Sequence, residues 1–129
     1  MNQPKVSVLE DMLAGMQPKL DERPFEFLES TGDDQAIFAL IHEDEGTTYV
    51  VASQGPGKVG QFARITLAVF SDLEGVGLTA AVSRALADAG IACNVIAAFH
   101  HDHLFVTWER REEAMQILQS LSRKAQASA

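Results

Sequence analysis

The sequence holds few of the residues on which several common functions depend. Among its 129 residues there is one cysteine, one tryptophan and one tyrosine, and the 10 lysines and arginines are outnumbered by 18 acidic residues. A lone cysteine cannot form an intramolecular disulfide, which suits a reducing compartment. The formal net charge of −8 repels phosphate backbones and anionic membrane surfaces, so neither nucleic acid nor membrane is expected as a partner.

The sequence also has no long apolar segment and no recognisable targeting signal. The most apolar stretch, residues 91–99, is much shorter than the roughly 20 residues that a membrane-spanning helix needs. The first residues lack the basic start and apolar run of a signal peptide. We therefore expect a cytoplasmic protein. The balance of 47% hydrophobic and 22% charged residues is that of an ordinary globular domain with a real core.

The first half of the chain predicts one short helix and three strands. Ser7 and Glu10 have the spacing of a capping box, and the apolar residues after them fall on one helical face as far as Gly15. Residues 17–24 contain two prolines and predict an extended connector. Three segments rich in strand formers then predict an antiparallel meander over residues 25–29, 35–42 and 47–53.

The second half has a different pattern. It predicts a strand, a loop, a helix, two strands and a helix over residues 61–70, 71–77, 78–89, 91–100, 103–108 and 109–126. This order is that of a ferredoxin-like βαββαβ unit without its last strand, so we expect an α+β fold with antiparallel sheets. The missing edge must be covered by the first half or by another subunit. The glycine-rich stretch 53–60 predicts a boundary, which gives halves 1–58 and 59–129.

Three histidines and an aspartate occur together at residues 100–103. If the flanking strands pair as a hairpin, His101 and Asp102 form a two-residue loop, and His100 lies directly opposite His103. A turn explains the cluster without a metal, while a metal ion shared by His100 and His103 remains an alternative. Cys93 falls on the other face of its strand from His100, so it is expected to be a small buried hydrophobe and not a nucleophile.

A second informative stretch is the loop that precedes the first helix of the second half. Gly75, Gly77 and Ala80 match the form G-x-G-x-x-A of dinucleotide-binding loops. The next two strands form a hairpin instead of a parallel crossover, however, and the chain is too short for a doubly wound sheet. No NAD, FAD or other cofactor is therefore expected.

The same loop can suit a smaller ligand. Backbone amides near Gly77, Leu78 and Thr79, at the start of the helix, attract a carboxylate, and Asp72 and Glu74 can receive an ammonium group. An amino acid, which carries both charges, fits this loop better than a nucleotide does. The alternative is that the glycines only turn the chain and the acidic side chains are solvated.

The stretch from Phe62 to Val106, with its segments EGVGLTAA, GIACNV and HDHLFV, resembles an ACT domain, a small regulatory module of amino acid metabolism. The whole chain is similar to small bacterial proteins that have two ACT-like halves, of which the first is shortened. This resemblance implies a ferredoxin-like fold, a homodimer, and the binding of an amino acid or related metabolite without catalysis.

The resemblance also implies where a ligand binds, namely at the loop before the helix and on the second strand of the second half. Carried over to this sequence, the implied ligand-binding residues are Asp72, Leu73, Glu74, Gly75, Val76, Gly77, Leu78 and Asn94. Two other functions remain open. One is a protein–protein interaction module that binds no ligand, and the other is a metal-binding protein that uses the hairpin with His100 and His103.

Overall fold

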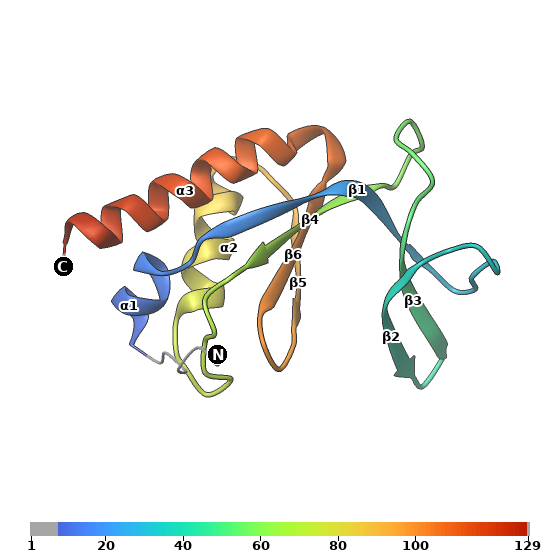
Figure 1. Ribbon diagram of the computed structural model, residues 1–129, viewed down its shortest axis with the longest axis horizontal. Helices are drawn as coiled ribbons and strands as arrows, with labels where there is room; N and C mark the ends of the chain where they lie inside the picture. The colour runs from blue at the N-terminus through green and yellow to red at the C-terminus, as the bar shows by residue number, and fades with distance from the viewer. Residues whose placement is uncertain (1–7, 129) are drawn as a thin grey trace.

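The computed structural model describes residues 8–128, and these form a curled antiparallel sheet with helices on one side. The sheet has six strands in the order β2-β3-β1-β4-β6-β5. Figure 1 shows the helices gathered at the end of the molecule opposite the β2–β3 hairpin. The elements are α1 (Leu9–Ala14), β1 (Pro18–Leu28), β2 (Ile37–Glu43), β3 (Gly46–Ala52), β4 (Phe62–Leu67), α2 (Leu78–Asp88), β5 (Cys93–Ala97), β6 (Asp102–Thr107), a 3₁₀ turn (Trp108–Arg110) and α3 (Arg111–Ala127).

The expected ferredoxin-like α+β architecture is confirmed, and the sheet shows how its missing strand is replaced. Strand β1 pairs antiparallel with β4, in the register Lys19 opposite Thr66 and Leu20 opposite Ile65. It therefore occupies the edge that the last strand of a βαββαβ unit normally fills. Of the two expected ways of covering this edge, the structure uses the first half of the same chain.

The expected connector at residues 17–24 was wrong, because most of it belongs to β1. Its two prolines are placed where a strand tolerates them. Pro18 is the first residue of the strand, and Pro24 follows the register shift between Leu20 and Pro24. Past this irregularity, Phe25 is paired both with Phe62 on β4 and with Ala52 on β3, so β1 joins the two halves into one sheet. The division into halves 1–58 and 59–129 stays a prediction.

The two faces of the sheet carry separate cores. On the helical side, Ile65, Leu67 and Leu104 pack beneath the apolar stripes of α2 and α3, including Val82 and Leu118. This burial is the usual source of stability for short amphipathic helices. On the other face lies a smaller cluster of four buried residues, Phe25, Val50, Ala52 and Phe105. The curl of the sheet lets β2 add Phe38 and Ala39 to that second cluster.

Helix α1 is held against α3 and the β4–α2 loop. The Ser122 hydroxyl and the Gln126 amide both donate to the carbonyl oxygen of Ala14, at 3.1 and 2.9 Å. These bonds satisfy one of the carbonyls that a helix end leaves free. The predicted helix is thus confirmed, while Ser7, one member of its expected capping box, lies outside the described residues.

Candidate functional site

A small pocket lies where the β4–α2 loop meets α1 and the β5–β6 hairpin. Its volume is about 140 Å³. The loop contributes five of the ten lining residues, the first turn of α2 contributes two, and α1, β5 and β6 contribute one each. The lining residues are Met12, Ser71, Asp72, Leu73, Gly75, Gly77, Leu78, Thr79, Ala97 and Asp102. Such a volume suits a small molecule, because pockets for drug-sized ligands span roughly 300–1,000 Å³.

The loop is kept open by two glycines that lie close to α1. A Cβ atom on Gly75 would come within 3.2 Å of Met12 Sδ and 3.0 Å of the Asp72 carbonyl oxygen. Gly77 has φ +105°, and a Cβ atom there would come within 3.2 Å of Leu9 Cδ2. A side chain at either position would therefore crowd the loop against the helix. Asp72 shapes the same turn, because its Oδ1 accepts a hydrogen bond from the Glu74 amide at 2.9 Å.

Helix α2 begins at this pocket without a side-chain cap. Its N-cap residue is Gly77, in the left-handed region, and no side chain of residues 8–128 accepts a hydrogen bond from the first turn. The backbone amides of the first helical residues, Leu78 and Thr79, have no intrahelical acceptor because of their position. They give this end of the pocket a partial positive charge that favours an anionic group.

Of the predicted ligand-binding residues, the structure brings five to the pocket and leaves three outside. Asp72, Leu73, Gly75, Gly77 and Leu78 line it, whereas Glu74, Val76 and Asn94 do not. Val76 is 82% exposed. Asn94 is exposed on β5, on the face that carries Ile96, while Ala97 belongs to the face of the pocket. Alternation of side chains along a strand accounts for this separation.

Five lining residues lie outside the predicted set. Thr79 was noted in the sequence only for its backbone amide, and the other four were missed, namely Met12, Ser71, Ala97 and Asp102. The expected two-residue hairpin loop was wrong, and this hid Asp102. Ala97 is paired with Asp102, so the loop comprises residues 98–101 and Asp102 is the first residue of β6. Met12 could be recognised as apolar, but only tertiary packing places α1 against the loop.

The same register changes the expected histidine geometry. His103 lies opposite Ile96, and His100 lies in the loop, so the two are not paired across the hairpin as expected. Within residues 8–128, no group of three or more metal-ligating side chains comes together. Cys93 is half-buried against the helical core, and burial raises the pKa of its thiol to about 11. A protonated thiol is a poor nucleophile.

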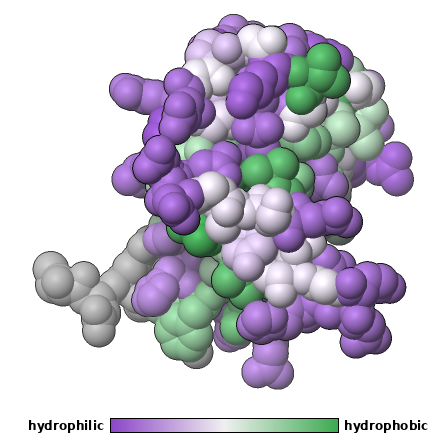
Figure 2. Space-filling view, turned by 90° about the vertical axis from the view of Figure 1, so that its right-hand side faces the viewer, coloured by the Kyte–Doolittle hydropathy of each residue, from purple (hydrophilic) through white to green (hydrophobic). Residues whose placement is uncertain are grey.

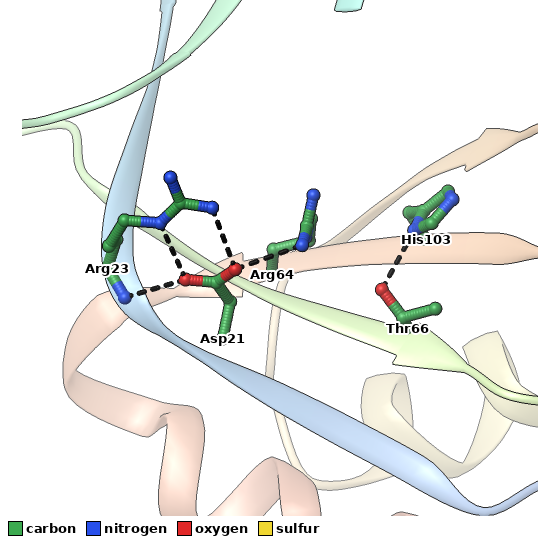
Figure 3. Close-up of polar contacts among 5 residues, drawn as sticks. All are labelled: Asp21, Arg23, Arg64, Thr66 and His103. Atoms are coloured by element: carbon green, nitrogen blue, oxygen red, sulfur yellow. Dashed lines mark hydrogen bonds and ion pairs between the residues drawn. The ribbon is translucent and has the colours of Figure 1, made fainter. Parts of the chain in front are cut away.

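A polar cluster on the opposite face of the sheet supports the fold (Figure 3). Asp21 Oδ2 accepts hydrogen bonds from Arg23 Nη2 at 3.1 Å and from Arg64 Nη2 at 2.9 Å. The hydrogen bonds from Arg23 are the main reason why the pKa of Asp21 is lowered. The Arg64 guanidinium lies 4.3 Å from the ring centre of Phe38, so β2, β1 and β4 are held together by charge and aromatic contacts.

His103 adds a pH-sensitive group to this face. Its Nδ1 lies 2.8 Å from the Thr66 hydroxyl, and its ring packs against Phe38 with the ring centres 4.9 Å apart. Burial, followed by the charges of Arg64 and His101, lowers the pKa of His103 from 6.5 to about 4. The imidazole is therefore neutral at pH 7 in the folded protein.

We predict that the His103→Gln variant is less sensitive to acid than the native protein. Below pH 6.5 the unfolded chain protonates His103 while the folded chain does not, so stability is lost as pH falls from 6.5 towards 4. The pKa difference corresponds to ~3 kcal/mol, which partial exposure reduces to roughly 1–2 kcal/mol. Urea unfolding of both proteins at pH 4.5 and at pH 7 measures the loss in the free energy of unfolding between these two pH values. Equal losses in both proteins would contradict this role, since the other titrating groups are shared.

Comparison with known proteins identifies the family. A model described as ACT domain matches residues 61–120, and a second model of the same description matches residues 6–55. A solved protein of unknown function from Vibrio cholerae, described as a possible transport protein, is 37% identical, with 84% of this chain and 91% of that chain covered and a TM-score of 0.71. The chain belongs to the ACT domain family. It carries two ACT-type domains, as the sequence resemblance indicated.

Two more distant structures share the fold of this ACT protein. The regulatory subunit of aspartate kinase from Thermus thermophilus, in its ligand-free form, is 11% identical, with 83% of this chain and 97% of that chain covered and a TM-score of 0.61. A protein from Agrobacterium tumefaciens is 15% identical, with 77% and 81% covered and a TM-score of 0.51. No curated protein matches the chain. No helix within residues 8–128 is long and apolar enough to cross a membrane.

Proposed function

We propose that this ACT protein is a regulatory, non-catalytic binding protein for a small amino acid or related metabolite, which acts in the cytoplasm. ACT domains are regulatory modules that typically bind amino acids and often form dimers. The observation that carries the proposal is the 140 Å³ pocket at the uncapped start of α2. In this proposal the ligand carboxylate is held by the amides of Leu78 and Thr79.

The size of the pocket supports a small ligand. A dinucleotide requires an elongated crevice, and the βα turn of dinucleotide-binding folds precedes a parallel crossover. Here α2 is followed by the antiparallel β5–β6 hairpin. The Met12 side chain packs against the loop at Gly75 and limits the space there. A compact zwitterion such as glycine, alanine or serine matches the available space.

The pocket also has a structural route to a regulatory response. Its walls come from α1, from the β4–α2 loop and from the β5–β6 hairpin, so a bound molecule contacts both halves of the chain. A ligand can shift a conformational equilibrium only by its difference in affinity between two states. A ligand that contacts α1 and the loop at once binds best when these two segments are packed together, so its binding stabilises that packed state.

Calorimetric titration with each of the twenty common amino acids tests the proposal. We expect at least one of the small ones to bind, and we expect Ala97→Leu, which fills the pocket, to weaken that binding by about tenfold or more. Ala98→Leu places the same side chain one position along the chain, outside the lining, and serves as the matched control. Flat titrations of the native protein with all twenty would overturn the proposal.

The homodimer is proposed to form through the β2 edge. This edge strand leaves backbone groups unpaired on one side among the described residues, and it exposes Ile37, Leu40 and Ile41 by 49, 46 and 41%. Figure 2 looks onto this end of the molecule and shows apolar side chains scattered among hydrophilic ones. Pairing of backbone groups would therefore be the main contact between two copies.

We predict that analytical ultracentrifugation shows a dimer whose population falls in the Leu40→Lys variant. A lysine on an edge strand opposes pairing with a second copy. Val59→Lys adds the same charge at a fully exposed position in the loop between β3 and β4 and should leave the dimer intact. A monomer at all concentrations, or an equal response to both changes, would rule out this interface. If no amino acid binds, the exposed β2 edge favours the alternative function, a protein–protein interaction module that binds no ligand.

A further inference from the structure

Asp102 is a buried acid that lines the pocket. It begins β6, opposite Ala97 on β5, and only 9% of its surface is exposed. Ser71, which follows β4, lies beside it and also lines the pocket. Acidic residues are rarely buried to this extent unless an opposite charge or several hydrogen bonds compensate for the lost water.

Within residues 8–128, Asp102 has little such compensation. Its carboxylate accepts a single hydrogen bond, from Ser71 Oγ at 3.5 Å, which is at the limit of hydrogen-bonding distance. The neighbouring His101 directs its Nδ1 to the Val69 carbonyl oxygen at 3.3 Å, and no ion pair joins it to Asp102. Burial is the main reason why the pKa of Asp102 is raised. The carboxylate therefore lacks a close donor.

The other acids near the pocket are in a different situation. Asp72 Oδ1 already accepts the Glu74 amide at 2.9 Å and stabilises the turn, and Glu74 does not line the pocket. Asp21, on the opposite face of the sheet, shows what a satisfied acid looks like in this fold, with two arginines within 3.1 Å. Among these acids, Asp102 is therefore the one that lines the pocket, is buried, and still has a carboxylate oxygen available to accept a hydrogen bond.

The pocket therefore combines two complementary ends. The uncapped first turn of α2 offers backbone donors, and Asp102 offers carboxylate oxygens as acceptors. A molecule with a carboxylate and an ammonium group on adjacent positions would satisfy both ends at once. A simple carboxylic acid would satisfy the helix but would leave Asp102 without a partner.

We infer that Asp102 receives the ammonium group of the ligand and makes the pocket selective for amino acids over the corresponding 2-hydroxy acids. This inference rests on the proposed function, because it assigns a role within the same pocket. Charged hydrogen bonds between ammonium and carboxylate groups are roughly twice as strong as neutral ones. In a 2-hydroxy acid a neutral hydroxyl takes the place of the ammonium group, so Asp102 keeps one hydrogen-bond donor but loses the opposite charge that compensates for its burial, and this is the source of discrimination.

Calorimetry with three matched pairs of probes tests the inference, namely glycine and glycolate, L-alanine and L-lactate, and L-serine and L-glycerate. In each pair a hydroxyl replaces the ammonium group. We expect the native protein to prefer the amino acid by about tenfold or more. In Asp102→Asn, which keeps the side-chain shape, we expect the affinity for the amino acid to fall by about tenfold while that for the hydroxy acid changes by less than about twofold.

The outcomes separate the two proposals. If the native protein binds an amino acid and its hydroxy analogue equally well, Asp102 does not bind the ammonium group selectively. The inference then fails, while the proposed function stands. This comparison needs no variant, so it holds even if Asp102→Asn does not fold. Asp88→Asn removes an exposed acid on α2 and controls for the change in net charge. If no probe or other amino acid binds the native protein, the proposed function fails, and the inference fails with it.

Discussion

Phe105→Ala is expected to lower the free energy of unfolding by about 3–5 kcal/mol, the usual cost of removing a buried phenylalanine ring. Phe105 is fully buried on β6. Its ring centre lies 6.0 Å from that of Phe25, 5.3 Å from Phe27 and 5.9 Å from Phe38. Two of these partners are on β1 and one is on β2, so the ring joins the second half of the chain to the first.

The substitution should therefore destabilise both halves together. Urea unfolding followed by circular dichroism measures the loss, and a single transition is expected because β1 is shared between the halves. Phe99→Ala provides the matched control, since Phe99 is 67% exposed in the β5–β6 loop and should change stability by less than about 0.5 kcal/mol. Two separate transitions, of which only one responds to Phe105→Ala, would show that the halves fold independently.

The fold could be predicted to the level of its elements and their order, because the signals are local. The apolar stripe of α2 and the stop at Gly90 are visible in the sequence, and the structure has both. The start of β1 could not be found in this way. Pro18 and Pro24 argue against a central strand, and only the pairing partner shows that one begins the strand while the other follows an irregularity.

The site could be predicted only in part, for a similar reason. The glycine loop was recognisable because Gly75 and Gly77 meet a steric demand that local sequence displays. The contributions of Met12 and Asp102 depend on how distant segments pack and on the register of a hairpin. The hairpin loop has four residues where two were expected, so Asp102 begins a strand instead of lying in the turn. Because side chains alternate between the two faces of a strand, Asp102 then faces the pocket.

The second large effect is expected for Gly77→Ala, with a loss of about 2–3 kcal/mol in the free energy of unfolding. Two costs contribute. The residue has φ +105°, which side chains other than glycine rarely adopt, and the new Cβ atom would lie 3.2 Å from Leu9 Cδ2. The second cost falls on the contact between α1 and the loop, which is also a wall of the pocket.

Gly60→Ala separates these costs, because Gly60 has φ +84° but no atom within 4 Å of the added Cβ. We expect it to lose about 1 kcal/mol from backbone strain alone. Combining Gly77→Ala with Leu9→Ala removes the crowding, so the extra cost of the glycine substitution should fall by about 1 kcal/mol in that background. Urea unfolding of the four proteins in this cycle gives the coupling directly. Additive losses would show that α1 does not press on the loop. That result would argue against Met12 of α1 as a wall of the pocket.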